Sequence, residues 1–323
     1  MRKILLLNTA LVLSASAFAQ DDLLGMLGEE ETGPQYTSAA FKTTRVINAH
    51  SLENTAAGVL DFRIGHRFGP GNGGLQDFFG IDGATVRLGF DYGVNDRLMV
   101  GFGRSGYQKT LDAFVKYKLV RQCDEGCSAP LTLAIVAASS MTTLDAQEVP
   151  WYDPAREDYF THRLSYAWTL IVGRKFSESV SFQLNPGVVH RNLVASAADP
   201  NDVFHASGAG RVKITKRLAF NAEYFHVLRD GLDDQFKNSL SVGFDIETGG
   251  HVFQLHLSNS AGMFDRAFIT ESNGDWARTF GRPGDGPGIH FGFNISRVFT
   301  LKEPKRAKAQ AALLRARRET ERG

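Results

Sequence analysis

The chain has 323 residues, of which 43% are hydrophobic and 22% charged, with two cysteines and a formal net charge of +1. This composition excludes an intrinsically disordered chain, a collagen and a small protein held together by disulfides. Because the near-zero net charge gives no general attraction to polyanions, we expect no nucleic-acid partner.

Residues 1–19 have the pattern of a secretory signal peptide. Arg2 and Lys3 precede a mostly apolar run, and the small residues Ala17 and Ala19 form a cleavage site. We expect cleavage after Ala19 and a final location in the outer membrane of a Gram-negative cell, reached through an oxidising compartment. Beyond the signal there is no run of about 18 apolar residues, which excludes a helical membrane protein. A membrane-spanning chain of this kind must form a closed β-barrel.

Beyond the signal, the hydrophobic pattern repeats every second residue. In 60–68, Leu60, Phe62 and Ile64 alternate with charged residues and glycine, which is the pattern of a strand with one apolar face. The same alternation occurs in segments that begin at Val86, Leu98, Leu111, Leu164, Val180, Leu218, Leu240 and Ile289. These segments are about 10 to 14 residues long and match tilted membrane strands, so we favour a barrel over a secreted β-sandwich.

Loop lengths allow the strands to be counted. Short and long connections alternate, as in bacterial barrels with short periplasmic turns, and we predict an all-β fold. It is a transmembrane antiparallel up-and-down β-barrel of about 12 strands. The predicted strands are 58–68, 84–95, 97–107, 109–121, 131–142, 160–176, 179–194, 203–216, 218–228, 238–248, 250–258 and 289–300. Residues 41–50 alternate weakly and are either an extra strand, which forces a recount toward 14, or a plug.

We expect four regions along the chain. They are a signal peptide (1–19), an acidic segment with the plug or extra strand (20–57), the outer-membrane barrel (58–301) and a short basic tail (302–323). The tail is rich in alanine and arginine and reads as a helix or a disordered segment. Its expected partners are anionic headgroups, the acidic segment or a periplasmic protein.

Strand parity places charged side chains on the inner face, while outer-membrane lipid contacts the apolar face. The predicted lumen-lining residues are Asp61, Arg63, Arg67, Arg87, Asp91, Asp112, Lys116, Lys118, Arg163, Arg191, Arg211, Lys213, Glu223 and Asp245. With Lys175 and Glu247 included, ten basic residues face six acidic ones. This excess favours a narrow channel or binding barrel for small polar or anionic solutes. Alternatively, the charges pair across strands and seal a non-conducting barrel that recruits partners.

Cys123 and Cys127 lie between two predicted strands, and in an oxidising compartment we expect them to form a disulfide. Two thiolates without a nearby histidine supply only half of a tetrahedral metal shell, so we predict no metal site and no cofactor. The outer loop at 264–287 has acidic side chains that would suit calcium, namely Asp265, Glu271, Asp275 and Asp285. Its glycines favour a flexible loop instead.

The stretch His256-Leu257-Ser258-Asn259-Ser260 resembles the H-x-S-N-G signature of outer-membrane phospholipase A, in which the histidine activates the serine. His256 and Ser258 share one face of their strand, whereas Leu257 belongs to the lipid side. The pair is therefore turned toward the lumen, away from a lipid substrate, and Ser260 replaces the final glycine. A lipid hydrolase is the least favoured function, and we expect a barrel without enzymatic activity.

Four short stretches carry a family resemblance: 41–45 (FKTTR), 66–69 (HRFG), 78–83 (FFGIDG) and 103–105 (GRS). Together with most of residues 23–299, they resemble an uncharacterised Bacteroidota family of outer-membrane β-barrel proteins. The resemblance implies the barrel fold and the outer-membrane location. It implies no activity, because the family is a domain of unknown function.

Overall fold

The computed structural model describes residues 34–228, 232, 235–278 and 286–302. The expected signal peptide, most of the acidic segment and the tail beyond Lys302 lie outside the described residues. The chain divides into two parts, and they are described separately below. The larger part contains 37–122 and 129–302, and the smaller part contains 34–36 and 123–128.

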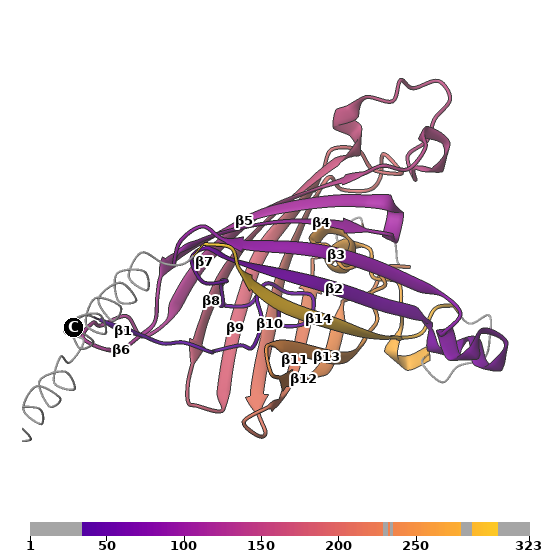
Figure 1. The fold of residues 1–323 in the computed structure, drawn as a ribbon. Helices are drawn as coiled ribbons and strands as arrows, with labels where there is room; N and C mark the ends of the chain where they lie inside the picture. The colour runs from indigo at the N-terminus through magenta and orange to yellow at the C-terminus, as the bar shows by residue number, and fades with distance from the viewer. Residues whose placement is uncertain (1–33, 229–231, 233–234, 279–285, 303–323) are drawn as a thin grey trace, which may run out of the picture. The chain divides into compact units, whose positions relative to one another are not determined.

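In the described residues of the larger part, twelve antiparallel strands close into one barrel (Figure 1). Each strand pairs with the next along the chain, and the last strand pairs with the first to close the ring. The strands are β2 (Val59–Pro70), β3 (Ala84–Gly93), β4 (Leu98–Ser105), β5 (Thr110–Val120), β7 (Thr132–Thr142), β8 (Leu164–Lys175), β9 (Val180–Arg191), β10 (Asp202–Lys213), β11 (Leu218–Val227), β12 (Leu240–Thr248), β13 (His251–Ser258) and β14 (His290–Thr300). The predicted fold and the count of twelve are confirmed. Residues 41–50 are not a barrel strand, so the alternative count of fourteen is wrong.

The connections differ between the two ends of the barrel. At one end, here called the short-turn end, β2 begins, β14 ends, and most turns are short. At the other, the long-loop end, most connections are long and carry short helices. These are the 3-10 helices η1 (Gly71–Gly80), η2 (Tyr107–Lys109), η3 (Ala146–Glu148), η4 (Phe160–Arg163) and η5 (Trp276–Arg278), and the α-helix α2 (Asp265–Thr270). In the described part of the chain, no helix has the length and apolar character needed to cross a membrane.

Burial alternates along the strands as the sequence pattern predicts. On β3, Leu88 and Phe90 keep 40% and 42% of their surface exposed, whereas Arg87 and Asp91 between them are buried. Apolar side chains thus face outward and charged ones face inward, the reverse of a soluble protein. The outward rows form a continuous apolar surface around the barrel wall.

Residues 40–55, here called the plug, lie inside the barrel. Their centre, 44–51, is a tight hairpin in which the Val46 N–H donates to the Ala49 carbonyl at 2.8 Å and the Ser51 N–H donates to Thr44 at 2.9 Å. Nearly all of the hairpin is buried. Of the two alternatives that the sequence left open for 41–50, the structure has the plug.

Residues 259–272, here called the inward loop, enter the barrel from the long-loop end. All six residues of α2 are buried, and the helix lies against β7, β8, β9 and β11. The expectation of a flexible outer loop across 264–287 is therefore wrong for its first part. The reason is hydrophobic, because Phe264, Phe268 and Ile269 are almost completely buried there.

One side of the inner wall is apolar and packs against these two insertions. Phe114, Val136, Ile171 and Val189 project inward from β5, β7, β8 and β9. They form one hydrophobic cluster with side chains of the plug and α2, namely Val46, Leu52, Phe268 and Ile269. Burial of each such side chain contributes about 1.5–3 kcal/mol, so the hydrophobic effect holds the plug and the inward loop in the lumen.

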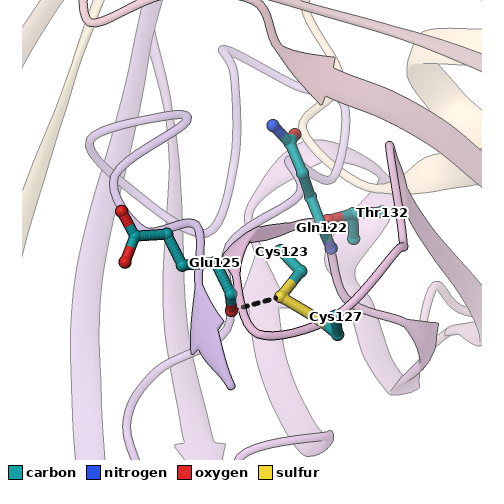
Figure 2. Close-up of a disulfide and its surroundings, with 5 residues drawn as sticks. All are labelled: Gln122, Cys123, Glu125, Cys127 and Thr132. Atoms are coloured by element: carbon teal, nitrogen blue, oxygen red, sulfur yellow. Dashed lines mark hydrogen bonds between the residues drawn. A yellow bond between two sulfur atoms is a disulfide. The ribbon is translucent and has the colours of Figure 1, made fainter. Parts of the chain in front are cut away.

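The smaller part is a two-stranded pair closed by a disulfide. β1 (Gln35–Tyr36) pairs with β6 (Cys123–Glu125) in antiparallel fashion. Cys123 and Cys127 are joined through their sulfur atoms, with a Cα–Cα distance of 5.8 Å, and the Cys123 sulfur lies 3.0 Å from the Glu125 carbonyl oxygen (Figure 2). The disulfide closes the small loop that the sequence places between β5 and β7.

Gly89 leaves room for the inward side chain of Arg87, and a larger residue at this position tests whether the lumen is tightly packed. The Arg87 guanidinium covers Gly89, where an added Cβ would lie 2.6 Å from Nη1. We expect Gly89→Val to displace Arg87 from Asp112 and to destabilise the barrel by about 1–3 kcal/mol, the usual cost of overpacking. The readout is the denaturant midpoint of the purified barrel. The control is Gly208→Val on the outer face, where a Cβ would meet its neighbours no closer than 3.5 Å. An equal effect of both substitutions would contradict the packed lumen.

Candidate functional site: the plugged lumen

Glu223 on β11 holds the tip of the plug. Its two carboxylate oxygens accept hydrogen bonds from the backbone N–H groups of Ile47, Asn48 and Ala49, at 2.9–3.1 Å. Three successive N–H groups that converge on one carboxylate form an anion-binding nest. Because the acceptor is charged, these bonds are stronger than bonds between neutral groups. The buried carboxylate and the turn of the hairpin therefore satisfy each other.

Other inward side chains bind backbone carbonyls of the plug and of the residue before it. They come from five further strands, β5, β9, β10, β13 and β14. The donors and acceptors are Lys116 to Ser51 and Glu53, Gln183 to His50, Arg211 to Ala39 and Ala40, Gln254 to Val46, and Asn294 to Ile47. The wall thus binds the main chain of the plug from several directions. Backbone groups that lack a sheet partner in the lumen obtain hydrogen bonds in this way.

Some of the charges in the lumen form ion pairs. Arg63 Nη2 lies 3.4 Å from Asp91 Oδ2 across neighbouring strands, and Arg87 forms an ion pair with Asp112. In addition, Lys42 of the plug pairs with Glu247 at the short-turn end. Part of the charge on the strands is therefore paired, as the sealed-barrel alternative anticipates.

The plug and the inward loop meet at Asp265 in α2. The Asp265 carboxylate lies 3.8 Å from Arg45 Nη1 and 3.8 Å from His50 Nε2. The His50 ring packs edge-on against Phe114, with 4.5 Å between centroids. Burial, together with the nearby Arg45 charge, lowers the pKa of His50 to about 3, so the ring is neutral at pH 7. Burial lowers the pKa of Arg45 only to about 10, so Arg45 stays charged and supplies the ionic contact.

The predicted lumen-lining residues divide into three groups. Buried in the structure are Asp61, Arg63, Arg67, Arg87, Asp91, Asp112, Lys116, Arg191, Arg211, Glu223 and Asp245. Lys118 and Lys213 are half-buried near the short-turn end. For Arg163 the prediction is wrong: it belongs to η4 before β8, where it forms an ion pair with Asp158 of the preceding loop.

The plug and the inward loop leave little open space in the lumen. A cavity of about 20 Å³ beside the plug tip and one of about 10 Å³ beside α2 each have room for about one water molecule. A larger cavity of about 270 Å³ lies at the long-loop end, where Trp151, Arg191 and Glu271 contribute to its lining. Beneath it, Arg266 donates to Glu271 at 2.5 Å and also to Gln108. Among the described residues, the plug and the inward loop therefore fill much of the lumen.

His256 and Ser258 are not hydrogen-bonded to each other in the structure. Both are buried in the lumen, away from the outer apolar surface. The Ser258 hydroxyl accepts from the Ser241 hydroxyl at 2.9 Å and from the Ser260 N–H at 3.1 Å. In the described residues, neither ring nitrogen of His256 has a hydrogen-bond partner. A serine nucleophile requires a hydrogen-bonded base, and this arrangement lacks one.

The acidic side chains considered for calcium are used in other contacts or lie elsewhere. Asp265 faces Arg45, Glu271 pairs with Arg266, and Asp275 pairs with Arg278. Asp285 falls outside the described residues. Within the residues that the structure describes, no group of three or more His, Cys, Asp or Glu side chains is arranged to hold a metal ion.

The sequence reasoning missed the apolar half of the inner wall. Strand β7 has Leu133 and Ile135 on the outer face but also Ala134 and Val136 on the inner face. A strand of a water-filled barrel has a polar inner face, so an apolar pattern on both faces is the signal that something packs inside. The uncharged polar residues that bind the plug, such as Gln183 and Gln254, carry no comparable signal.

Loss of the Glu223 carboxylate is expected to loosen the plug. In Glu223→Gln, the neutral amide keeps only one acceptor oxygen and turns an NH₂ donor toward the plug tip at the other position, so loss of the charge and of one acceptor costs about 1–3 kcal/mol. Trypsin cleavage after Arg45 reports release, because the hairpin must leave the lumen to be cut. We expect cleavage about tenfold faster or more than in the wild type. The control is Asp61→Asn, which removes a buried carboxylate that accepts from the Ser296 hydroxyl of β14. Equal resistance of Glu223→Gln and wild type would refute the role of Glu223.

Several solved structures of outer-membrane channels are distantly similar to the chain. Among solved structures, the NanC porin is 10% identical, with a TM-score of 0.43 over 75% of this chain and 98% of that one. An outer membrane channel from Pseudomonas putida F1 is 14% identical, with a TM-score of 0.40 over 76% and 97%. OmpF from Salmonella typhi, in complex with daunomycin, is 7% identical, with a TM-score of 0.36 over 75% and 97%. These likenesses say nothing about the solute.

A family model gives the identification. Among curated proteins, no sequence matches the chain. The model of the family described as "Membrane bound beta barrel domain (DUF5777)" matches residues 41–299, from the plug to the end of β14. The match covers most of the chain, and it agrees with the closed barrel and its apolar outer surface. The chain therefore belongs to this family of membrane-bound β-barrel domains of unknown function.

Proposed function

We propose that the protein is an outer-membrane barrel that is closed at rest and passes small polar solutes only when the plug leaves the lumen. The observation that carries this proposal is the filling of the lumen by residues 40–55, bound through their backbone to inward side chains of β5, β9, β10, β11, β13 and β14. The short-turn end would face the periplasm, as the short turns of bacterial barrels do. The sequence of residues 1–19 supports export.

The inner wall favours a movable plug over a permanent core. Around the plug tip the wall carries charged side chains, including Arg63, Arg67 and Asp91. Water would solvate these charged groups once the plug left the lumen, so opening would not leave them unsolvated in an apolar environment. The opposite side of the wall is apolar around Phe114 and Ile171, and its exposure to water would oppose opening. Burial of the apolar side of the wall therefore favours the closed barrel, while solvation of the charged side lowers the cost of opening.

The charges of the open passage would have both signs. Arg63 with Asp91 and Arg87 with Asp112 would line it as adjacent cations and anions. Such a lining accepts small polar solutes and gives weaker selection for anions than the basic lumen expected from the strand residues alone. The buried position of His256 and Ser258 does not favour a lipid hydrolase.

Conductance in planar bilayers tests the proposal. We expect the wild type to be silent or to open rarely, because the plug fills the lumen. A variant without residues 40–55 is expected to conduct steadily, and Glu223→Gln is expected to open more often than the wild type.

The control for conductance is Asp61→Asn, which keeps the acceptor for the plug tip and the Gln254 contact with Val46. Folded barrel must be verified by the heat-dependent gel mobility of each variant. A folded deletion variant that stays silent would refute the gated channel and favour the structural, partner-recruiting barrel. A wild type that conducts steadily would show that the plug does not close the passage.

A further inference from the structure

Four arginines surround the small cavity beside the plug tip. Arg45 comes from the plug, whereas Arg63, Arg67 and Arg87 come from β2 and β3 of the wall. Asn48 of the plug, Met263 of the inward loop and Asn294 of β14 complete much of the lining. The cavity therefore lies where the plug, the wall and the inward loop meet.

Several guanidinium nitrogens at this cavity have no protein acceptor. They are Nε and Nη2 of Arg45, Nη1 of Arg63 and Nε of Arg67, and all are buried among the described residues. Their side chains are more than nine-tenths buried. A buried donor of a charged group without an acceptor is costly, so this cluster requires an acceptor that the protein does not supply.

Among the described residues, three of the four arginines have a carboxylate within ion-pair distance, and the fourth, Arg67, has none. Arg63 contacts Asp91, Arg87 pairs with Asp112, and Arg45 lies 3.8 Å from Asp265. In the described part of the chain, Arg67 has no carboxylate within ion-pair distance. Its Nη2 donates to the Asn48 side-chain oxygen at 2.8 Å, and its Nη1 is 3.4 Å from the His66 carbonyl oxygen. Glu223 lies beyond ion-pair distance of Arg67, and its oxygens accept from backbone N–H groups of the plug.

We infer that this cavity is a binding site for one small monovalent anion, with chloride as the physiological class. The volume of about 20 Å³ matches a particle the size of a water molecule or a halide, which favours a small monovalent anion over a larger organic acid. A bound anion supplies an acceptor to the unpaired Arg67 guanidinium and to the other donors that lack one. Because its donors come from both the plug and the wall, the bound anion holds the plug in place. The site exists whether or not the plug ever moves, so it does not rest on the proposed function.

Bromide is the probe for the wild-type protein. Crystals of the full chain grown in sodium bromide, measured at the bromine absorption edge, are expected to show an anomalous peak between Arg45, Arg63 and Arg67. Well-ordered arginines without such a peak would mean that water alone fills the cavity and would overturn the inference. This measurement requires no variant and is independent of conductance.

Thermal unfolding provides a second test. Replacement of gluconate by chloride at constant ionic strength is expected to raise the unfolding midpoint of the wild type in a saturable way, by about 2–4 °C. Arg67→Gln is expected to lose this rise. The control is Arg191→Gln, which removes a buried arginine that lies at the long-loop cavity and not at this one. A rise that is equal in wild type and Arg67→Gln would overturn the inference.

Discussion

A barrel wall that faces a closed lumen must find partners for every charge it carries inward, and in this protein the partners come largely from the plug. Glu223 is the clearest case, because its carboxylate is buried and three backbone N–H groups of the hairpin tip converge on it. The dependence is mutual. The hairpin is buried in the lumen and joins no sheet, so its backbone N–H and C=O groups need hydrogen-bond partners on the wall. Wall and plug therefore stabilise each other, and neither is satisfied alone.

The inner wall meets this requirement with two different surfaces. Toward β2 and β3 it presents arginines and aspartates, and toward β7, β8 and β9 it presents apolar side chains such as Val136 and Ile171. The plug is matched to both, since its tip binds polar groups while Val46 and Leu52 pack in the hydrophobic cluster. The inward loop covers the same apolar side with Phe268 and Ile269. Because the plug has one polar and one apolar side, only one orientation in this lumen places each side against a matching part of the wall. The hydrogen bonds and the hydrophobic contacts therefore favour the same orientation of the plug.

Most of the barrel could be predicted from the sequence, because a period of two over long segments determines both the strands and their inward side. The same parity correctly placed residues such as Asp61 and Arg211 in the lumen. It failed for Arg163, which precedes the regular part of its strand. The contents of the lumen were harder to predict. Residues 41–50 alternate too weakly for periodicity to distinguish a strand from a plug. In the loop at 264–287, the four-residue spacing of Phe264 and Phe268 indicates a buried helical turn, but the glycines at 281–288 favoured a flexible loop. Contacts between a loop and a distant wall leave no local pattern in the chain.

The most direct test of the central claim is amide hydrogen exchange of Ile47, Asn48 and Ala49 in the full-length protein reconstituted in lipid bilayers. A hairpin tip bound by Glu223 inside the lumen predicts strong protection of these three amides, comparable to that of the barrel strands. Exchange at the rate of an unstructured peptide would mean that residues 40–55 lie outside the lumen, and it would contradict the plugged barrel.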